Sequence, residues 1–199
     1  MRRLVLMLST MATAMLLVGG VALADHLATT VQCPTDPDGY CYGPEESAHI
    51  YGTEGPDTIS GGSGDDQIDA LGGDDYVHAG IGNDTIYGGD GGDKLDGADD
   101  NNKIFGGAGQ DELDGYEGAD YLHGGTEKDD LDGWSGKDQI RAGSGPDAIY
   151  TGRYTAGGAS SNGDRVVDTV DCGSGIDRVY FEQGIDKINS NCEKKNPPY

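Results

Sequence analysis

Aspartates recur every nine residues through the middle of this 199-residue chain and are its most regular chemically active side chains. From Gly52 to Tyr150 the sequence divides into eleven units of nine without insertion or deletion, and position 6 is Asp in ten units and Asn in one. Each carboxylate follows a Gly-rich stretch whose backbone carbonyls can add oxygens, which suits Ca²⁺, a hard cation with about six to eight oxygen ligands. The pattern predicts a cation at every turn, with candidate ligands Asp57, Asp66, Asp75, Asp84, Asp93, Asn102, Asp111, Asp120, Asp129, Asp138 and Asp147.

Other positions of the unit predict the elements that hold these carboxylates. Position 8 is Ile, Leu or Val in all eleven units and lies between variable residues, which is typical of a short strand with one side chain inward and two outward. Position 1 is always Gly or Ala, position 4 is Gly in nine units, and position 2 is often Gly. These residues let the backbone turn tightly, the glycines by reaching positive φ. Asp100 and Glu127 depart from Gly at position 4.

The units resemble the GGxGxDxUx repeat of the RTX, or hemolysin-type calcium-binding, family. The resemblance implies an all-β, right-handed parallel β-roll, a β-solenoid in which two units make one turn of 18 residues and position 8 packs inside. It also implies Ca²⁺ between successive loops, held by position-6 side chains one turn apart. One metal row is then Asp57, Asp75, Asp93, Asp111, Asp129 and Asp147, and the other is Asp66, Asp84, Asn102, Asp120 and Asp138. Two of the nine neighbouring pairs contain Asn102 and are expected to be weak or empty.

The charge of the chain excludes several classes of partner. With 13 basic and 36 acidic residues its net charge is −23 at pH 7, so neither nucleic acid nor an anionic membrane surface is an expected partner. Residues 52–150 alone carry 24 acidic and 5 basic side chains, a net of −19 that nine Ca²⁺ ions would almost neutralise. High charge with low hydrophobicity is typical of disorder. We therefore expect the metal-free chain to be disordered and calcium to drive its folding.

The first 24 residues are predicted to be a cleaved signal peptide. Arg2 and Arg3 precede an apolar run from Leu4 to Val18, and a small-x-small site ends at Ala24. The alternative, a membrane anchor, needs a longer apolar span. We expect a secreted, extracellular protein with no integral membrane segment after cleavage. Toxins and proteases of the family use an uncleaved C-terminal signal instead, so their export route is not implied.

Four cysteines mark the two ends of the expected mature chain. Of the three possible pairings, Cys33–Cys41 with Cys172–Cys192 joins near neighbours and is favoured for an oxidising compartment, and a zinc site is the rival interpretation. We expect an N-terminal cap over 25–51, a loop over 151–162, and degenerate repeats with a C-terminal cap over 163–199. The degenerate units keep Asp at position 6, as Asp168, Asp177 and Asp186.

Positions 7 and 9 of the unit predict two unlike outward faces. One face carries aromatic and basic residues on successive turns: Tyr87, Phe105, Tyr121, His123 and Arg141. The other carries an acidic ladder: Asp96, Asp114 and Asp132. One interpretation of the aromatic face is an ordinary sheet surface, because outward aromatics stabilise cross-strand pairs. The other is a partner surface for the cell wall, a carbohydrate or a second copy of the chain.

The sequence contains no catalytic constellation. The histidines His26, His49, His78 and His123 are scattered, and the regularly spaced aspartates are better explained as metal ligands than as acid/base catalysts. We therefore do not expect an enzyme. Two functions remain: a calcium-dependent structural or interaction module, and an extracellular calcium buffer or sensor without a macromolecular partner.

Overall fold

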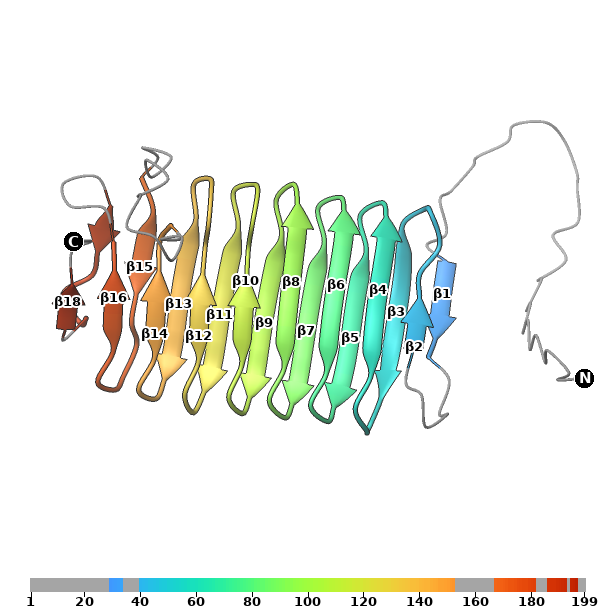
Figure 1. Ribbon diagram of the computed structural model, residues 1–199, viewed down its shortest axis with the longest axis horizontal. Coiled ribbons are helices and arrows are strands. Elements are labelled where there is room, and N and C mark those ends of the chain that lie inside the picture. Colours follow the sequence, from blue (N-terminus) through green and yellow to red (C-terminus); the bar gives the residue numbers. More distant parts are fainter. Residues whose placement is uncertain (1–28, 34–39, 153–166, 182–185, 193, 197–199) are drawn as a thin grey trace, which may run out of the picture.

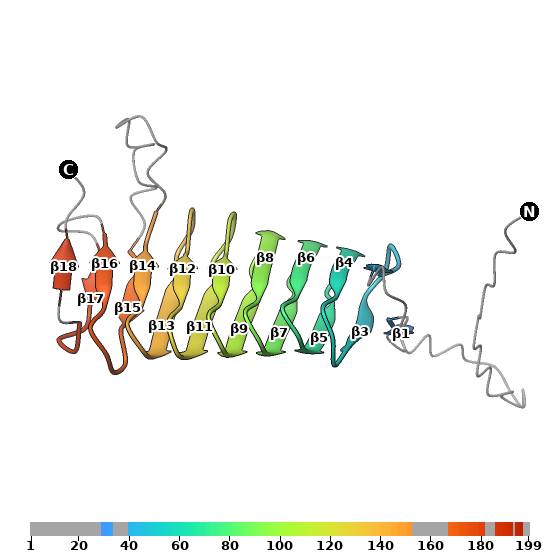
Figure 2. The same cartoon turned by 60° about the horizontal axis from the view of Figure 1, so that its bottom comes forward.

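The chain folds as a flat solenoid that passes back and forth between two parallel sheets (Figure 1). The computed structural model describes residues 29–33, 40–152, 167–181, 186–192 and 194–196. Within these ranges each sheet has nine strands and no helix occurs, so none could span a bilayer. Figure 2 shows the even-numbered strands in one layer and the odd-numbered strands in the other. The prediction of an all-β parallel β-solenoid is confirmed.

We call the two layers the odd-strand sheet and the even-strand sheet. The odd-strand sheet contains β1 (Thr29–Gln32), β3 (Ala48–Thr53), β5 (Gln67–Gly72), β7 (Thr85–Asp90), β9 (Lys103–Ala108), β11 (Tyr121–Thr126), β13 (Gln139–Ser144), β15 (Thr169–Asp171) and β17 (Lys187–Ile188). The even-strand sheet contains β2 (Tyr40–Tyr42), β4 (Thr58–Ser63), β6 (Tyr76–Ile81), β8 (Lys94–Asp99), β10 (Glu112–Asp114), β12 (Asp130–Asp132), β14 (Ala148–Tyr150), β16 (Arg178–Tyr180) and β18 (Lys194–Asn196).

The register of both sheets uses two nine-residue units per turn. Residues 18 apart pair on neighbouring strands, as Ile59 does with Val77 on β4 and β6. Between β13 and β15 the step is 30 residues, where Ile140 meets Val170, and β14 and β16 keep that larger step. The extra twelve residues equal the length of the predicted loop 151–162, so the units that follow return to the same place in the coil. Residues 153–166 lie outside the described part.

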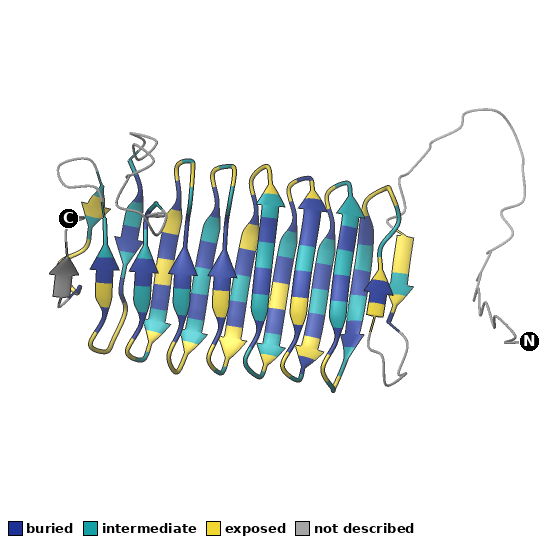
Figure 3. Ribbon diagram, viewed as in Figure 1, coloured by how far each residue is buried: buried dark blue, intermediate teal, exposed yellow. Residues whose placement is uncertain are grey.

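The core is a double column of position-8 side chains, one column from each sheet. From β3 to β16 these side chains are at most 1% exposed: Ile50, Ile59, Ile68, Val77, Ile86, Leu95, Ile104, Leu113, Leu122, Leu131, Ile140, Ile149, Val170 and Val179. More buried and less buried residues alternate along most strands, as in β7 (Figure 3). Full burial of one aliphatic side chain stabilises a protein by about 1.5–3 kcal/mol. This column is therefore the main apolar source of cohesion.

Position 1 also points inward. Its restriction to small residues was predicted from tight turning of the backbone, but the structure shows a different cause. Position-1 glycines lack positive φ; a Cβ on Gly115 would lie 2.6 Å from Oδ2 of Asp120 and 2.9 Å from the carbonyl oxygen of Gly133. Room beside the carboxylate, rather than backbone conformation, restricts this position to Gly or Ala. Ala70, where Ala is present, is fully buried.

Positive φ is confined to positions 2 and 4 of the repeat. Gly89 and Gly91 show it in one unit, with φ of 117° and 131°. Six residues other than glycine adopt it too, and all occupy one of these two positions: Leu71, Ala98, Asp100, Tyr116, Glu127 and Trp134. A non-glycine residue in this region costs about 1–2 kcal/mol. The turn geometry is therefore imposed by the coil even where the sequence opposes it.

Disulfides close the core at both ends. Cys33 is bonded to Cys41 and Cys172 to Cys192, and no described cysteine is free, which excludes the zinc alternative. Cys41 lies opposite Ile59 in the register and so occupies the place of a position-8 side chain. The segment 25–51 contains β1, β2 and β3. Strands β2 and β3 pair with the repeats at the 18-residue step, and β1 pairs with β3 at a step of 19 residues. The predicted signal peptide lies outside the described residues.

Truncation of one core side chain should destabilise the solenoid strongly. We expect Ile140→Ala to lower the free energy of unfolding in saturating calcium by about 2–5 kcal/mol, because it leaves a cavity in a closed column. Gln139→Ala, on the exposed side of the same strand, should change it by no more than about 0.5 kcal/mol. Urea unfolding followed by circular dichroism measures both, and equal losses would contradict the assigned faces.

Candidate metal centre

From Asp66 to Asp147, each position-6 carboxylate joins two successive coils through one of its oxygens. Oδ1 of Asp93 accepts the backbone N–H of Asp75 at 2.9 Å, and Oδ1 of Asp111 accepts that of Asp93 at 2.9 Å. The bond recurs along both edges of the solenoid. One row, before the even strands, contains Asp57, Asp75, Asp93, Asp111, Asp129, Asp147 and Asp177. The other, before the odd strands, contains Asp66, Asp84, Asn102, Asp120, Asp138, Asp168 and Asp186.

The second oxygen of most interior carboxylates faces the loop without a donor. Oδ2 is buried and accepts no hydrogen bond in eight aspartates: Asp66, Asp75, Asp84, Asp93, Asp111, Asp120, Asp129 and Asp147. Leaving a buried acceptor without a donor costs about 1–3 kcal/mol, and more when the acceptor is charged. A cation bound in each of these loops would remove that cost.

Asn102 identifies the atoms that surround this place. Its Oδ1 accepts the N–H of Asp84 at 2.9 Å, as an aspartate would, which turns its amide nitrogen toward the loop. That nitrogen donates to the carbonyl oxygens of Gly97, Asp99 and Asp100 at 3.1, 3.2 and 3.2 Å. Carbonyls at positions 1, 3 and 4 thus converge on the place of the second carboxylate oxygen. In the equivalent aspartate loops oxygen would face oxygen, an arrangement that a cation stabilises.

At one end of each row a threonine hydroxyl donates to the second carboxylate oxygen, which has no donor in most interior loops. Oδ2 of Asp57, the first aspartate of its row, accepts the backbone N–H and the hydroxyl of Thr53 at 2.6 and 3.0 Å. Oδ2 of Asp186, the last in the other row, accepts the hydroxyl of Thr151 at 2.7 Å. The sequence pattern did not predict these contacts. Thr53 departs from the glycines common at position 2, which is a signal, whereas Thr151 lies outside the regular units.

The donor atoms of the loops fit calcium. No group of three or more His, Cys, Asp or Glu side chains gathers in the described part of the chain. Each loop instead offers one row carboxylate, and backbone carbonyls add the other oxygens, as is usual for a hard cation of flexible geometry. Asp100 and Glu127 keep the positive φ of position 4, so their backbone still follows the loop.

Burial raises the pKa of eight row carboxyls above the ordinary 3.8, namely those of Asp66, Asp75, Asp84, Asp93, Asp111, Asp120, Asp129 and Asp147. The pKa reaches about 7 in three of them, Asp75, Asp120 and Asp129. It reaches about 6 in three others, Asp66, Asp84 and Asp111. Desolvation is the largest cause, the hydrogen bond from the preceding coil acts against it, and neighbouring carboxylates add to it in five of the six. Without metal, ionisation of these carboxyls is therefore less favourable in the folded coil than in water.

The predicted outward aromatic residues come together on the odd-strand sheet. Tyr87, Phe105, His123 and Arg141 pair in register from β7 to β13. The rings of Tyr87 and Phe105 are stacked, with centroids 5.0 Å apart and planes at 11°. Arg141 places its guanidinium carbon 5.9 Å from the centre of the Tyr121 ring.

The acidic ladder of the even-strand sheet is more covered than its outward position predicts. Asp96, Asp114 and Asp132 align in register, but Asp114 and Asp132 are only 9% and 8% exposed. The indole N–H of Trp134 donates to Asp114 at 3.1 Å, and His78 lies 3.0 Å from a carboxylate oxygen of Asp96. The ladder is therefore partly satisfied within this sheet and its loops, although Oδ1 of Asp96 is buried and accepts no hydrogen bond.

Comparison with known families identifies the same units. The family model described as the RTX calcium-binding nonapeptide repeat matches four times, over residues 51–86, 78–113, 87–122 and 114–149. Each match begins at the residue before a position 1, so its register agrees with that of the strands. No curated protein matches the chain.

Acid should stabilise the metal-free solenoid. Because the folded pKa values of about 6–7 lie above 3.8, the stability from protonated row carboxyls is present below about pH 3.8 and is lost as pH rises through 6–7. We expect chelated protein to gain β-sheet circular dichroism on titration from about pH 8 to about pH 4. When calcium is present, protons compete with it for the row carboxylates. The calcium concentration at which half of the protein is folded should therefore increase as the pH is lowered from about 8 to about 4. A chelated sample that gains no β-sheet signal on acidification would contradict the raised pKa values.

Replacing the row's single asparagine should create a further site. In Asn102→Asp an oxygen replaces the nitrogen that donates to three carbonyls. We expect one more bound Ca²⁺ per chain in isothermal titration calorimetry, and a loss of about 1–3 kcal/mol of stability in chelator. Asn101→Asp is the matched control, because it adds the same charge on the exposed side of the same loop. Equal stoichiometry in Asn102→Asp and wild type would refute the assignment.

Proposed function

Because residues 51–149 belong to the RTX calcium-binding nonapeptide repeat family, whose repeats bind calcium, we propose that the chain is a secreted structural or interaction module that calcium folds. The observation that carries the proposal is the series of buried Oδ2 atoms without donors. Each is a buried acceptor without a hydrogen-bond donor, which a cation in its loop would satisfy. The proposed role contains no catalytic step, and the regular aspartates act as ligands.

Electrostatics supports coupling between metal binding and folding. Residues 52–150 have a net charge of −19, and carboxylates of neighbouring coils lie about one strand spacing, roughly 4.8 Å, apart. Their repulsion opposes the metal-free coil. A divalent ion in each loop converts that repulsion into attraction, so its binding free energy contributes to folding free energy.

The loops favour Ca²⁺ over Mg²⁺. Their ligands are carbonyls and carboxylates of a continuous backbone, which suit a cation of variable geometry, whereas Mg²⁺ needs near-octahedral ligands and retains water. Extracellular calcium modules bind with dissociation constants of about 10⁻⁴–10⁻³ M. A module of that affinity would be unfolded in a calcium-poor cell interior and folded outside.

Two features support an extracellular location. Arg2 and Arg3 followed by the apolar run to Val18 are typical of an exported chain. The bonds Cys33–Cys41 and Cys172–Cys192 persist in oxidising compartments and would be reduced in most cytosols.

A calcium buffer is the alternative function. The density of the rows favours it, since eight unsatisfied carboxylate oxygens lie within residues 66–147. A buffer needs no outward surface, so substitutions on the sheet faces would leave its function intact. A module acts through such a surface.

Calcium titration of the chain tests the proposed function. We expect chelated protein at neutral pH to lack β-sheet circular dichroism and to gain it cooperatively with Ca²⁺ near millimolar concentration, but not with equal Mg²⁺. A β-sheet spectrum unaffected by chelation would overturn the proposal.

A pair of variants tests the ligand assignment within that experiment. Asp93→Ala removes a row carboxylate, so we expect at least one fewer Ca²⁺ per chain and a higher calcium midpoint. Asp90→Ala removes the same charge from an exposed position of the same unit and should keep the stoichiometry. Equal effects of the two substitutions would show that net charge, rather than ligation, controls folding.

A further inference from the structure

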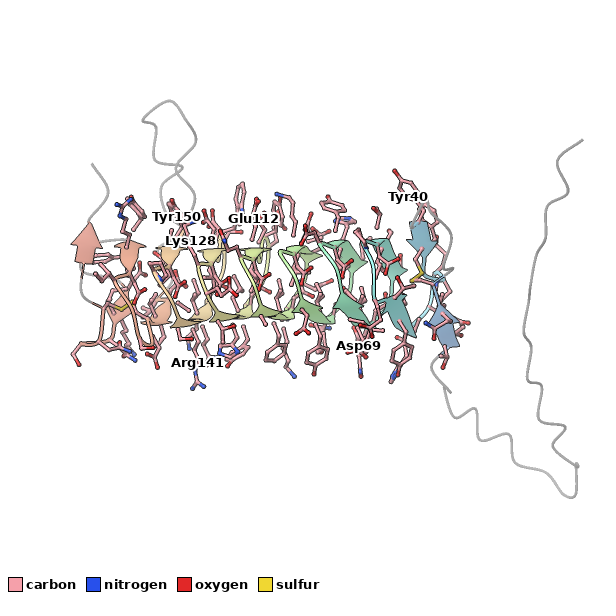
Figure 4. The ribbon with its side chains drawn as sticks, turned by 90° about the horizontal axis from the view of Figure 1, so that it is seen from below. Tyr40, Asp69, Glu112, Lys128, Arg141 and Tyr150 are labelled. Atoms are coloured by element: carbon pink, nitrogen blue, oxygen red, sulfur yellow. A yellow bond between two sulfur atoms is a disulfide. The ribbon has the colours of Figure 1, made fainter. Side chains whose placement is uncertain are left out.

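The outward face of the odd-strand sheet has a charge pattern that is complementary to itself. Its position-9 residues align on successive coils in the order Tyr51, Asp69, Tyr87, Phe105, His123, Arg141 and Asp171. Phe105 is at the centre, with an acid two coils away on one side and a base two coils away on the other. Figure 4 shows Asp69 and Arg141 pointing out of the same face, toward opposite ends of the solenoid.

The middle of this face is a rigid aromatic patch. Phe105 contacts Tyr87 at 5.0 Å, Tyr121 at 5.6 Å and His123 at 6.3 Å between ring centres. Tyr87 remains 39% exposed and Arg141 is exposed. Because the rings of Tyr87 and Phe105 stack on each other, they cover one another's faces, which disfavours a platform for stacking sugar rings. Aromatic residues are enriched in protein interfaces, and the single charged side chain on the central strand of this face is Lys103.

We propose that this face binds a second copy of the chain, forming a two-fold dimer whose axis runs along the strands at Phe105. Such an axis reverses the order of coils in the second copy and keeps position 9 opposite position 9. Asp69 then meets Arg141 twice, Tyr87 meets His123 twice, and Phe105 meets its own copy. At position 7 Lys103 also meets its own copy, so two pairs of opposite charge are set against one pair of like charge. The interface is isologous, so it closes as a dimer.

The ends of the column extend the same complementarity. Tyr51, three coils from the axis, faces Asp171 of the second copy, which offers a carboxylate to a phenol hydroxyl. A two-fold axis along the solenoid would instead oppose positions 7 and 9 of one coil. That alternative places Gln67 against Asp69 and Gln139 against Arg141, without a single pair of opposite charges. The arrangement along the strands is the one that the charges favour.

The area of the face predicts a weak dimer. Seven coils at about 4.8 Å and six-residue strands at about 3.3 Å per residue give about 600 Å² per copy. Stable complexes bury about 800 Å² per partner, so the contact lies at the lower end of specific interfaces. Aligned strands in packed sheets, about 10 Å apart, are an established geometry.

The dimer rests on the proposed calcium-driven folding, because the metal-free chain has a net charge of −23. Two metal-free copies repel each other, and the face itself exists only when the coils are folded. Calcium in the rows removes both obstacles. The dimer should therefore appear in calcium and dissociate in chelator.

Charge reversal tests the dimer. In saturating calcium we expect sedimentation equilibrium to show a concentration-dependent dimer of wild type. Asp69→Arg and Arg141→Asp alone should each weaken association at least about tenfold, because each places like charges opposite one another twice. The double variant Asp69→Arg/Arg141→Asp should restore it. Arg178→Asp, on the outer side of the even-strand sheet, is the matched control and should leave association unchanged.

Circular dichroism of each variant separates this inference from the proposed function. A β-sheet spectrum in calcium with monomeric wild type, or with single reversals that dimerise normally, would overturn the dimer and leave calcium folding standing. Retention of a folded monomer on insoluble cell-wall polysaccharide would assign the face to a carbohydrate instead. A chain that does not fold in calcium would overturn both.

Discussion

The solenoid depends on the way each row carboxylate divides its two oxygens. Oδ1 accepts the backbone N–H of the preceding coil, so side-chain hydrogen bonds hold the coils together in addition to those of the sheets. Oδ2 is left among loop carbonyls, where a negative atom is unfavourable. The same residue thus specifies the fold and makes it incomplete without a cation. The same carboxylate links two coils and needs a cation beside its second oxygen, so a substitution that removes one effect also removes the other.

The two edges of the solenoid differ in the number of loops in which a carboxylate needs a cation. The row before the even strands contains aspartate throughout, from Asp57 to Asp177. The row before the odd strands is interrupted at Asn102, whose amide donates to the carbonyls that a cation would otherwise contact. One coil near the middle is therefore satisfied internally on one edge.

The repeat made much of this structure predictable, because period and residue type report directly on strand, turn and ligand. The inward column at position 8 and the 18-residue register follow from it. The features that the sequence did not predict depend on contacts between residues of different coils. The restriction at position 1 comes from the neighbouring carboxylate beside Gly115, and the cover over Asp114 comes from Trp134, 20 residues away. The coil formed by 29–33 and 40–51 escaped because its units lack Asp at position 6, although the pairing of Cys41 with Ile59 shows that it keeps the register.

The enlarged step between β13 and β15 bears on how chains of this kind can diversify. Ile140 still meets Val170 although twelve more residues separate them than separate other partners, so length was added at a coil edge without disturbing the strands on either side. A slip of one residue inside a strand would instead turn the inward column outward. Insertions at the edges that re-enter in phase are thus nearly neutral for the fold. Selection can vary such segments in length and composition, and acquire new recognition elements there, while the coils beneath them stay unchanged.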